Sequence, residues 1–153
     1  MTHNVALVVG AEGGIGRAFA NVLDEEDEFD VVVRFSRSDE SPVKLDITNQ
    51  QSIIDAANWL VDQNIKPTLI FIATGLLHKG ERSPEKSLKD LEPDWLLENY
   101  QINAIGPALV AKHFLPLMPI DGISKFVAIS ARVGSISDNR LGGWYGYRAA
   151  KAA

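Results

Sequence analysis

The chain has 153 residues, 46% of them hydrophobic, and no cysteine, so it is long enough for one domain with a sizeable core but carries no disulfide and no Cys-based metal site. A formal net charge of −5 argues against a surface that binds nucleic acid or anionic membranes. No apolar run is long enough to cross a bilayer, and the N-terminus lacks the basic start of a signal peptide. We therefore expect a single-domain cytoplasmic protein with no metal site and no nucleic-acid or membrane partner.

The first predicted element is a continuous apolar run at residues 5–9, which is typical of a strand buried on both faces of a parallel sheet. A predicted helix follows near Gly14 or Ile15, and its buried stripe is expected at Ala18, Phe19, Val22 and Leu23. The turn between strand and helix is Gly10-Ala11-Glu12-Gly13-Gly14-Ile15-Gly16. Its glycines let backbone approach a phosphate, and the free N–H groups of the helix start attract an anion.

Residues 30–35 are predicted to form the second strand, and in dinucleotide-binding folds the end of this strand selects the coenzyme. A carboxylate there binds a ribose 2′-hydroxyl, whereas an arginine accepts a 2′-phosphate. This chain has Ser36-Arg37-Ser38 at that point, so Arg37 and two hydroxyls favour NADP over NAD. An exposed loop arginine is the alternative for Arg37, and the nearby acids Asp39 and Glu40 keep NAD possible.

A short third strand is expected at residues 43–45, ending at Asp46. Residues 36–42 are too few for the usual crossover helix, so that helix is expected to be lost or reduced to an extended link. Residues 48–51, Thr-Asn-Gln-Gln, have the pattern of a capping box and open a helix with Ile53, Ile54, Ala57, Leu60 and Val61 on one side. A buried strand at residues 68–72 then ends at Ala73-Thr74-Gly75, where a coenzyme ribose can lie beside backbone.

Residues 78–93 are polar and contain two prolines, which predicts a surface excursion at the carboxyl edge of the sheet. A long helix, roughly 95–118, is expected next, with Asp94 as its cap. Pro107 has no N–H for the carbonyl of Asn103, four residues earlier. A free carbonyl at a kink beside an inward Asn103 suits an ordered water, and a simple kink with Asn103 facing solvent is the alternative.

The fifth strand is predicted at residues 125–130, and a loop rich in Ser and Gly leads from it to a helix with Tyr147 and Lys151. Positions i and i+4 share a helix face, and an ammonium beside a phenol is expected to lower the phenol pKa from its usual ~10. Such a tyrosine suits general acid/base work on a carbonyl/alcohol pair, although this spacing is also common by chance. The order of elements predicts an α/β, doubly wound parallel sheet of the Rossmann type with about five strands.

Five motifs in this order make the whole chain resemble the short-chain dehydrogenase/reductase family. Residues 9–16 resemble its TGxxxGxG turn, and residues 73–75 stand where the family has NAG. Asn103 matches the family's helix asparagine, residues 130–134 resemble SSxxG, and Tyr147 to Lys151 matches YxxxK. Residues 133–153 look most like the subgroup of C-factor and sniffer-type carbonyl reductases.

The resemblance implies a role for each matching catalytic position. Tyr147 is the expected proton donor to a carbonyl oxygen, and Lys151 is expected to lower its pKa and bind the nicotinamide ribose. Asn103 is expected to hold a relay water through its main-chain carbonyl. The family's catalytic serine is Ala131 here, so Ser130 or Ser135 is the candidate for the hydroxyl that polarises the carbonyl.

The resemblance also implies the coenzyme contacts. The pyrophosphate is expected along Gly10, Gly14, Ile15 and Gly16, the adenine beside Asp46 and Ile47, and the ribose beside Ala73, Thr74 and Gly75. The implied activity is NADP(H)-dependent hydride transfer to or from a small carbonyl or alcohol substrate, in a homo-oligomer. A non-catalytic nucleotide-binding or signalling module and an inactive truncated fragment are the alternatives.

The chain departs from the family pattern in further ways. Val9 replaces the threonine at the end of the first strand, and the paired asparagine of the fourth strand is missing. Family members continue past YxxxK with two more strands and a substrate-binding lobe. We therefore expect a C-terminally incomplete domain that lacks these last two strands, and the sequence leaves the substrate undefined.

Overall fold

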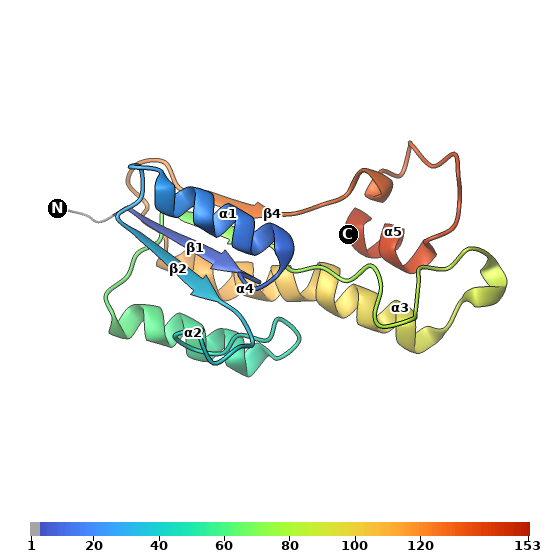
Figure 1. Ribbon diagram of the computed structural model, residues 1–153, viewed down its shortest axis with the longest axis horizontal. Helices are drawn as coiled ribbons and strands as arrows, with labels where there is room; N and C mark the ends of the chain where they lie inside the picture. Colours follow the sequence, from blue (N-terminus) through green and yellow to red (C-terminus); the bar gives the residue numbers. More distant parts are fainter. Residues whose placement is uncertain (1–3) are drawn as a thin grey trace.

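A four-stranded parallel sheet forms the centre of the computed structural model, which describes residues 4–153 (Figure 1). Its strands are β1 (Val5–Val9), β2 (Val31–Phe35), β3 (Leu69–Ile72) and β4 (Lys125–Ala128), in the spatial order β2-β1-β3-β4. β1 pairs with both β2 and β3, so that Val9 lies opposite Phe35 on one side and Ile72 on the other. Because every strand runs the same way, all carboxyl ends meet at one edge, where open α/β sheets bind ligands.

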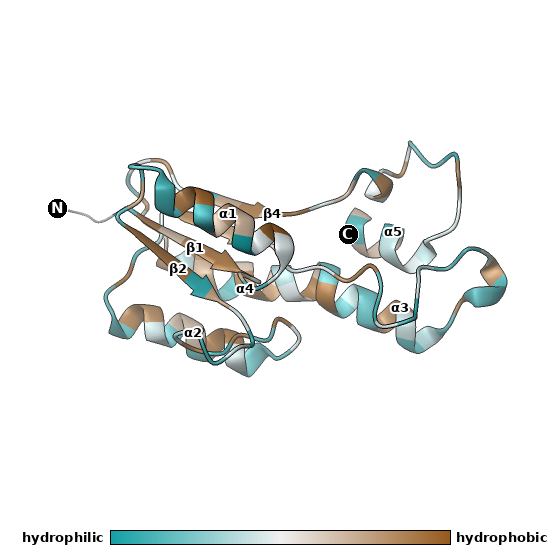
Figure 2. Ribbon diagram, in the orientation of Figure 1, coloured by the Kyte–Doolittle hydropathy of each residue, from teal (hydrophilic) through white to brown (hydrophobic). Residues whose placement is uncertain are grey.

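Helices cover both faces of the sheet, which confirms the predicted doubly wound α/β fold. On one face, α1 (Gly14–Glu25) packs with Ala6 and Val8 of β1. On the other face, α2 (Gln50–Asp62) and α4 (Gly106–Phe114) share a larger core with Leu7 and Phe35. Alternate residues of β1 therefore enter different cores, which explains why its apolar run is continuous. Figure 2 shows these strands among the most hydrophobic segments of the chain.

The predicted stripe of α1 was partly wrong. Gly16, Ala20 and Leu23 are buried, whereas Ala18 and Val22 are exposed. The buried face of α1 begins at Gly16, and a search for apolar side chains passes over a glycine. The predicted face was therefore rotated around the helix relative to the buried one.

The predicted capping box of α2 was also displaced by one residue. Asn49 caps the helix by accepting a 2.9 Å hydrogen bond from Gln51 N, while Thr48 donates to Asp46. Within α2, Ile53 and Leu60 are buried as expected, but Val61 is exposed.

The expected third strand at residues 43–45 is absent, so the sheet has four strands within residues 4–153 and not five. Leu45 N donates a 2.7 Å hydrogen bond to Ser36 O, and no ladder forms beyond it. The link is too short to carry the chain past β2, so it turns back along the end of that strand and enters α2. Leu45 and Ile47 bury their side chains in the larger core.

The predicted helix at 95–118 is a composite of several shorter elements. A short 3₁₀ turn, η1 (Leu88–Asp90), precedes α3 (Pro93–Tyr100), whose N-cap is Glu92 and not Asp94. A π-helical turn, η2 (Gln101–Ile105), then joins α3 to α4, and η3 (Leu115–Leu117) ends the segment. The wider turn falls where Pro107 withholds its N–H from the preceding turn, which accounts for the predicted distortion.

The last helix, α5 (Tyr145–Ala152), packs on α3 and η2 and lies beyond the carboxyl edge of the sheet (Figure 1). A 3₁₀ turn, η4 (Arg132–Gly134), and an exposed loop connect β4 to it. Among the helices formed by residues 4–153, none combines the length and apolar character needed to span a bilayer.

Candidate functional site

A cleft of about 890 Å³ opens at the carboxyl ends of β1, β2 and β3. Its walls come from the glycine turn, from the link after β2 and from the segment after β3. Most of the predicted coenzyme residues line it: Gly10, Arg37, Asp46, Ile47, Ala73, Thr74 and Gly75. Gly14, Ile15 and Gly16 do not line the cleft, where the turn instead contributes Glu12 and Gly13.

The glycine turn brings α1 close against the end of β1. A Cβ on Gly16 would lie 2.2 Å from Gly10 O, so only glycine allows this contact. Gly10 has a positive φ of 85°, and a Cβ there would lie 2.9 Å from Thr74 Cγ2. No side chain caps α1 at Gly13, so the first N–H groups of the helix have no side-chain acceptor and can bind an anion.

The segment after β2 is organised by hydroxyl groups. Ser36 is buried, its Oγ lies 2.8 Å from Ser38 Oγ, and Ser38 N donates to it over 3.1 Å. Arg37 is exposed and forms no hydrogen bond or ion pair with any of residues 4–153. Asp39, which kept NAD possible, is paired with Lys44 at 2.5 Å. The guanidinium at the cleft is therefore the cation left available to a ligand phosphate on this segment.

Asp46 presents an ionised carboxylate at the rim of the cleft. Its Oδ1 accepts hydrogen bonds from Thr48 N at 2.9 Å and from Thr48 Oγ1 at 2.7 Å. Burial raises the pKa of Asp46, but these hydrogen bonds and the charge of Arg37 outweigh burial and hold the pKa below its ordinary value. A fixed acceptor at this rim suits the amino or hydroxyl donors of a nucleotide.

One polar atom in the cleft has no partner. Thr74 Oγ1 is buried and makes no hydrogen bond with any of residues 4–153. Leaving such a group unsatisfied costs about 1–3 kcal/mol. The glycine turn, which admits no Cβ at Gly10 or Gly16, lets backbone lie close to an extended ligand in the cleft, as a dinucleotide is.

Asn103 points inward, which decides between the two predicted orientations. It is 7% exposed, its Oδ1 accepts from Leu76 N at 2.9 Å, and its Nδ2 donates to Leu76 O at 2.8 Å. The side chain therefore fixes the chain just after β3. A Cβ on Gly75 would lie 3.4 Å from Asn103 Oδ1 and 3.7 Å from Lys151 Nζ, so Asn103 and Lys151 meet beside Gly75, which lines the cleft.

Tyr147 and Lys151 lie on the same side of α5, as their spacing predicts. The Lys151 ammonium is 5.8 Å from the centre of the Tyr147 ring, and its Nζ donates a 2.7 Å hydrogen bond to Ile129 O. Burial raises the pKa of Tyr147 and lowers the pKa of Lys151. The expected decrease in the Tyr147 pKa is therefore wrong for the protein alone, because desolvation dominates and the ammonium is bound to a carbonyl.

Comparison with known protein families identifies the family to which the chain belongs. The sequence model of the family described as short chain dehydrogenase matches residues 4–153. The chain belongs to the short-chain dehydrogenase family. A 1-hydroxy-2-glutathionyl-2-methyl-3-butene dehydrogenase from Rhodococcus sp. (strain AD45) is 30% identical over 158 residues, which cover 98% of this chain and 66% of that protein. The chain therefore spans just under two thirds of this relative's length.

Solved structures of the family have the same fold. A Burkholderia multivorans protein of the short-chain dehydrogenase/reductase type, with bound NADP, is 27% identical and superposes with a TM-score of 0.83, covering 99% of this chain and 68% of that one. The carbonyl reductase Sniffer of D. melanogaster is 20% identical and superposes with a TM-score of 0.83. The match covers 100% of this chain and 71% of the Sniffer chain. At 20% identity, the similarity to Sniffer shows only that the two proteins share a fold.

Neither Ser130 nor Ser135, the two candidates for the family's serine, forms a hydrogen bond with Tyr147 in the described part of the chain. Ser130 Oγ donates to Lys151 O at 3.3 Å, at the end of α5. Ser135 Oγ lies 3.4 Å from Ser137 Oγ and accepts from Asp138 N at 3.2 Å, within its own turn. Their hydroxyls stabilise the end of α5, which carries Tyr147, and the turn at residues 135–138.

Sequence reasoning missed two buried polar residues of this site, Glu85 and Asn99. Glu85 gave no signal, because it is a single acid in a polar excursion. Asn99 stands four residues before Asn103 on the same helical face, and that spacing was a usable signal. Asn99 Nδ2 donates to Trp95 O at 3.0 Å, and its Oδ1 lies 3.4 Å from Asn103 Nδ2.

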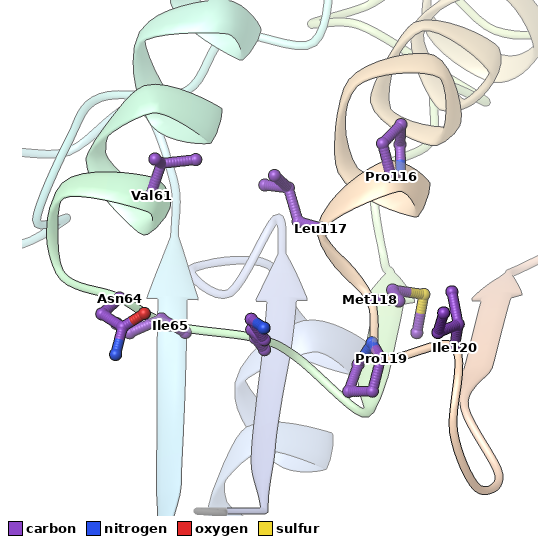
Figure 3. Close-up of a pocket in the computed structure, with 9 residues that line it drawn as sticks. Val61, Asn64, Ile65, Pro116, Leu117, Met118, Pro119 and Ile120 are labelled. Carbon is purple, nitrogen blue, oxygen red and sulfur yellow. The ribbon is translucent and has the colours of Figure 1, made fainter.

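A second cavity, of about 340 Å³, lies at the amino end of the sheet (Figure 3). It is formed by the end of α2 and by the segment that follows α4, with Ile65, Leu117, Met118 and Ile120 among its walls. Its lining is largely apolar, and Lys66 is its one ionisable residue. It shares no lining residue with the cleft at the carboxyl edge.

Proposed function

We propose that this chain supplies the coenzyme cleft and the proton donor of an NADP(H)-dependent oxidoreductase. The reaction is hydride transfer between the nicotinamide and a small carbonyl or alcohol. The observation that carries the proposal is the meeting of Asn103 and Lys151 beside Gly75, which lines the cleft, with Tyr147 one helical turn before Lys151. This brings an acid/base pair to the end of a site that fits a dinucleotide.

The preference for NADP rests on the segment after β2. Arg37 has no hydrogen bond or ion pair within the described chain and lines the cleft, while Asp39 forms an ion pair with Lys44. A guanidinium binds phosphate through charge-assisted hydrogen bonds, which are stronger than neutral ones. The Burkholderia multivorans relative, which holds NADP, supports the same choice. NAD remains the competing coenzyme that the binding experiment below discriminates.

The residues of this chain divide the chemistry between them. The bound coenzyme supplies the hydride. Lys151 donates one of its three N–H groups to Ile129 O, which leaves two for the hydroxyls of the nicotinamide ribose. Tyr147 is kept protonated by its raised pKa, so it holds the proton that a reduced carbonyl oxygen needs. The nearby ammonium stabilises the phenolate that remains after this transfer.

Asn103 acts as the support of this site in the proposal. Its side chain holds Leu76, and Pro107 cannot donate to its main-chain carbonyl, which suits that carbonyl to a water that returns the proton. Ala131 stands at the family's serine position, and the hydroxyls of Ser130 and Ser135 are engaged elsewhere. The substrate oxygen is therefore bound by Tyr147 without a serine partner from these two positions.

We also propose that the protein is a cytoplasmic homo-oligomer of the C-factor and sniffer-type subgroup. Leu97, Tyr100 and Ile105 are exposed along α3 and η2, and such an apolar face is what self-association buries. Light scattering after size exclusion tests this part, and a monomer over the whole concentration range would contradict it.

The test of the function combines binding and turnover. The purified protein should enhance NADPH fluorescence more strongly than NADH fluorescence, and should oxidise NADPH when a small aldehyde or dicarbonyl is added. Binding of neither nucleotide would reject the proposal. Binding of NADH with greater affinity than NADPH would reject the role of Arg37 alone.

A non-catalytic nucleotide-binding module is the second candidate, and one observation favours it. Position 131 is an alanine, and neither Ser130 nor Ser135 is hydrogen-bonded to Tyr147, so these positions offer no second group to polarise a carbonyl. This candidate predicts nucleotide affinity that is unchanged by Tyr147→Phe and no turnover in either protein. The same two measurements therefore separate it from the oxidoreductase.

A further inference from the structure

Glu85 is a buried acid that the proposed chemistry does not use. It lies in the excursion between β3 and α3 and is only 3% exposed. Acidic side chains are almost never buried this far unless they are paired. Glu85 has no ion pair within residues 4–153, so its partners are of another kind.

These partners are backbone N–H groups at the start of α5. Both carboxylate oxygens of Glu85 lie 3.3 Å from Gly146 N, which donates to them. The main-chain carbonyl of Glu85 accepts a 2.6 Å hydrogen bond from Trp144 N. One residue of a distant segment thus provides acceptors for two N–H groups at the helix start, directly before Tyr147.

The helix depends on such help from outside. α5 has eight residues, a length that is marginal for an isolated helix, and no side chain of its own caps it. Its N-cap, Trp144, has a left-handed conformation with φ 55° and ψ 38°, which is strained for a bulky residue and persists only where surrounding contacts hold it. A carboxylate at a helix N-terminus also interacts favourably with the helix dipole.

Two glycines make room for this contact. A Cβ on Gly146 would lie 2.9 Å from Glu85 Oε1 and 3.0 Å from Leu96 Cδ2. A Cβ on Gly143 would lie 3.1 Å from Glu85 O, and Gly143 has a positive φ of 65°. The sequence around α5 is therefore matched to the presence of Glu85 and admits no larger side chain at either position.

We propose that Glu85 is a positioning residue, which fixes the start of α5 and thereby the place of Tyr147 against the segment between β3 and α3. The Lys151 ammonium is held independently by Ile129 O, so Glu85 and Ile129 locate the two functional side chains of the helix. The effect of this placement on catalysis rests on the proposed function. The contact between Glu85 and the start of α5 is independent of that function.

The test compares Glu85→Ala and Glu85→Gln with Glu81→Gln, an exposed acid of the same excursion. Amide exchange at Trp144 and Gly146 is followed by NMR, together with the ¹³C ring signal of Tyr147, assigned with Tyr147→Phe. In Glu85→Ala we expect Gly146 to exchange about tenfold faster, because a hydrogen bond to a charged group is lost, and the Tyr147 signal to move. Glu81→Gln should match the wild type.

Glu85→Gln keeps a carbonyl oxygen for Gly146 N and guards against a failure of the alanine variant to fold. Its Gly146 exchange should be about threefold faster than in the wild type, since charge-assisted hydrogen bonds are roughly twice as strong as neutral ones. In turnover, Glu85→Ala should lower kcat about tenfold at unchanged KM, because misplacement of a catalytic group affects the chemical step.

Unchanged Gly146 exchange in both Glu85 variants would overturn the contact. An unchanged Tyr147 signal and unchanged kcat in Glu85→Ala would overturn the positioning role. A wild-type protein that binds no nucleotide and shows no turnover would reject the proposed function, while the exchange rates and the Tyr147 signal would still decide the role of Glu85.

Discussion

The Lys151 ammonium lies 5.8 Å from the centre of the Tyr147 ring and donates a 2.7 Å hydrogen bond to the carbonyl of Ile129. In this arrangement desolvation dominates, so the phenol stays protonated at neutral pH. A protonated Tyr147 is the form that donates to a carbonyl oxygen in the reductive direction. In the proposed reaction, Tyr147 is therefore in the protonated form that reduction of a carbonyl requires.

The titration of Tyr147 gives the first prediction. The burial-raised pKa means that Tyr147 should ionise above the ordinary value of about 10, later than an exposed tyrosine. Tyrosinate absorbance of the wild type minus that of Tyr147→Phe should show this late step. A step below the ordinary value would contradict the account of the coenzyme-free site.

The same shift affects stability at high pH. Above the unfolded pKa of a tyrosine, the unfolded state loses its proton while native Tyr147 keeps it, so the native state binds more protons and stability falls with rising pH until the folded pKa is passed. Below that range the stabilisation is fully present. Above pH ~10, the free energy of unfolding measured in urea should therefore fall more steeply for the wild type than for Tyr147→Phe.

A second prediction concerns the amide of Asn103. Asn103→Ala removes two hydrogen bonds to Leu76 and leaves buried backbone groups unpaired, each of which costs about 1–3 kcal/mol. We expect the free energy of unfolding to fall by about 2–4 kcal/mol in urea. Asn58→Ala, at an exposed position of α2, is the matched control and should change it by less than about 0.5 kcal/mol.

A third prediction tests Arg37. Loss of a charge-assisted contact with a phosphate costs about 1.5–3 kcal/mol, so Arg37→Ala should raise the Kd for NADPH about 10- to 100-fold and change the Kd for NADH far less. Lys112→Ala, which removes an exposed cation on α4, serves as the control for general charge effects. Equal losses of affinity for the two nucleotides in Arg37→Ala would refute recognition of the 2′-phosphate.

A fourth prediction compares two glycines of the same turn. A Cβ on Gly16 would lie 2.2 Å from Gly10 O, so Gly16→Ala must displace α1 from β1 and should lower both the midpoint of thermal unfolding and the affinity for NADPH. A Cβ on Gly14 meets no atom within 4 Å, so Gly14→Ala should be tolerated and can gain up to about 1 kcal/mol in helix propensity. Equal stability of the two variants would show that the close approach of Gly16 is not needed.

The parallel sheet and its carboxyl-edge cleft could be predicted because their signals are local. The continuous apolar run at residues 5–9 and the glycines after it specify a buried strand and a close helix, and both are present. Pro107 likewise predicted a distortion of the helix near Asn103, because proline has no backbone N–H to donate.

What the sequence could not predict depends on tertiary distance. The strand expected at residues 43–45 has the right composition, but its short link leaves no ladder for it to join. The pKa of Tyr147 depends on burial and on the carbonyl of Ile129, which lies far away in the chain. The contact of Glu85 with Gly146 forms only because the segment between β3 and α3 packs against α5 in the fold, and no residue spacing in the sequence predicts that packing.

The most direct measurement follows NADPH binding and NADPH oxidation in the wild type and in Tyr147→Phe, with a small aldehyde or dicarbonyl as substrate. We predict equal NADPH affinity in the two proteins and oxidation that is about 10²–10⁴-fold slower without the phenol, the range that general acid catalysis provides. Equal rates of oxidation in both proteins would contradict the assignment of Tyr147 as the proton donor.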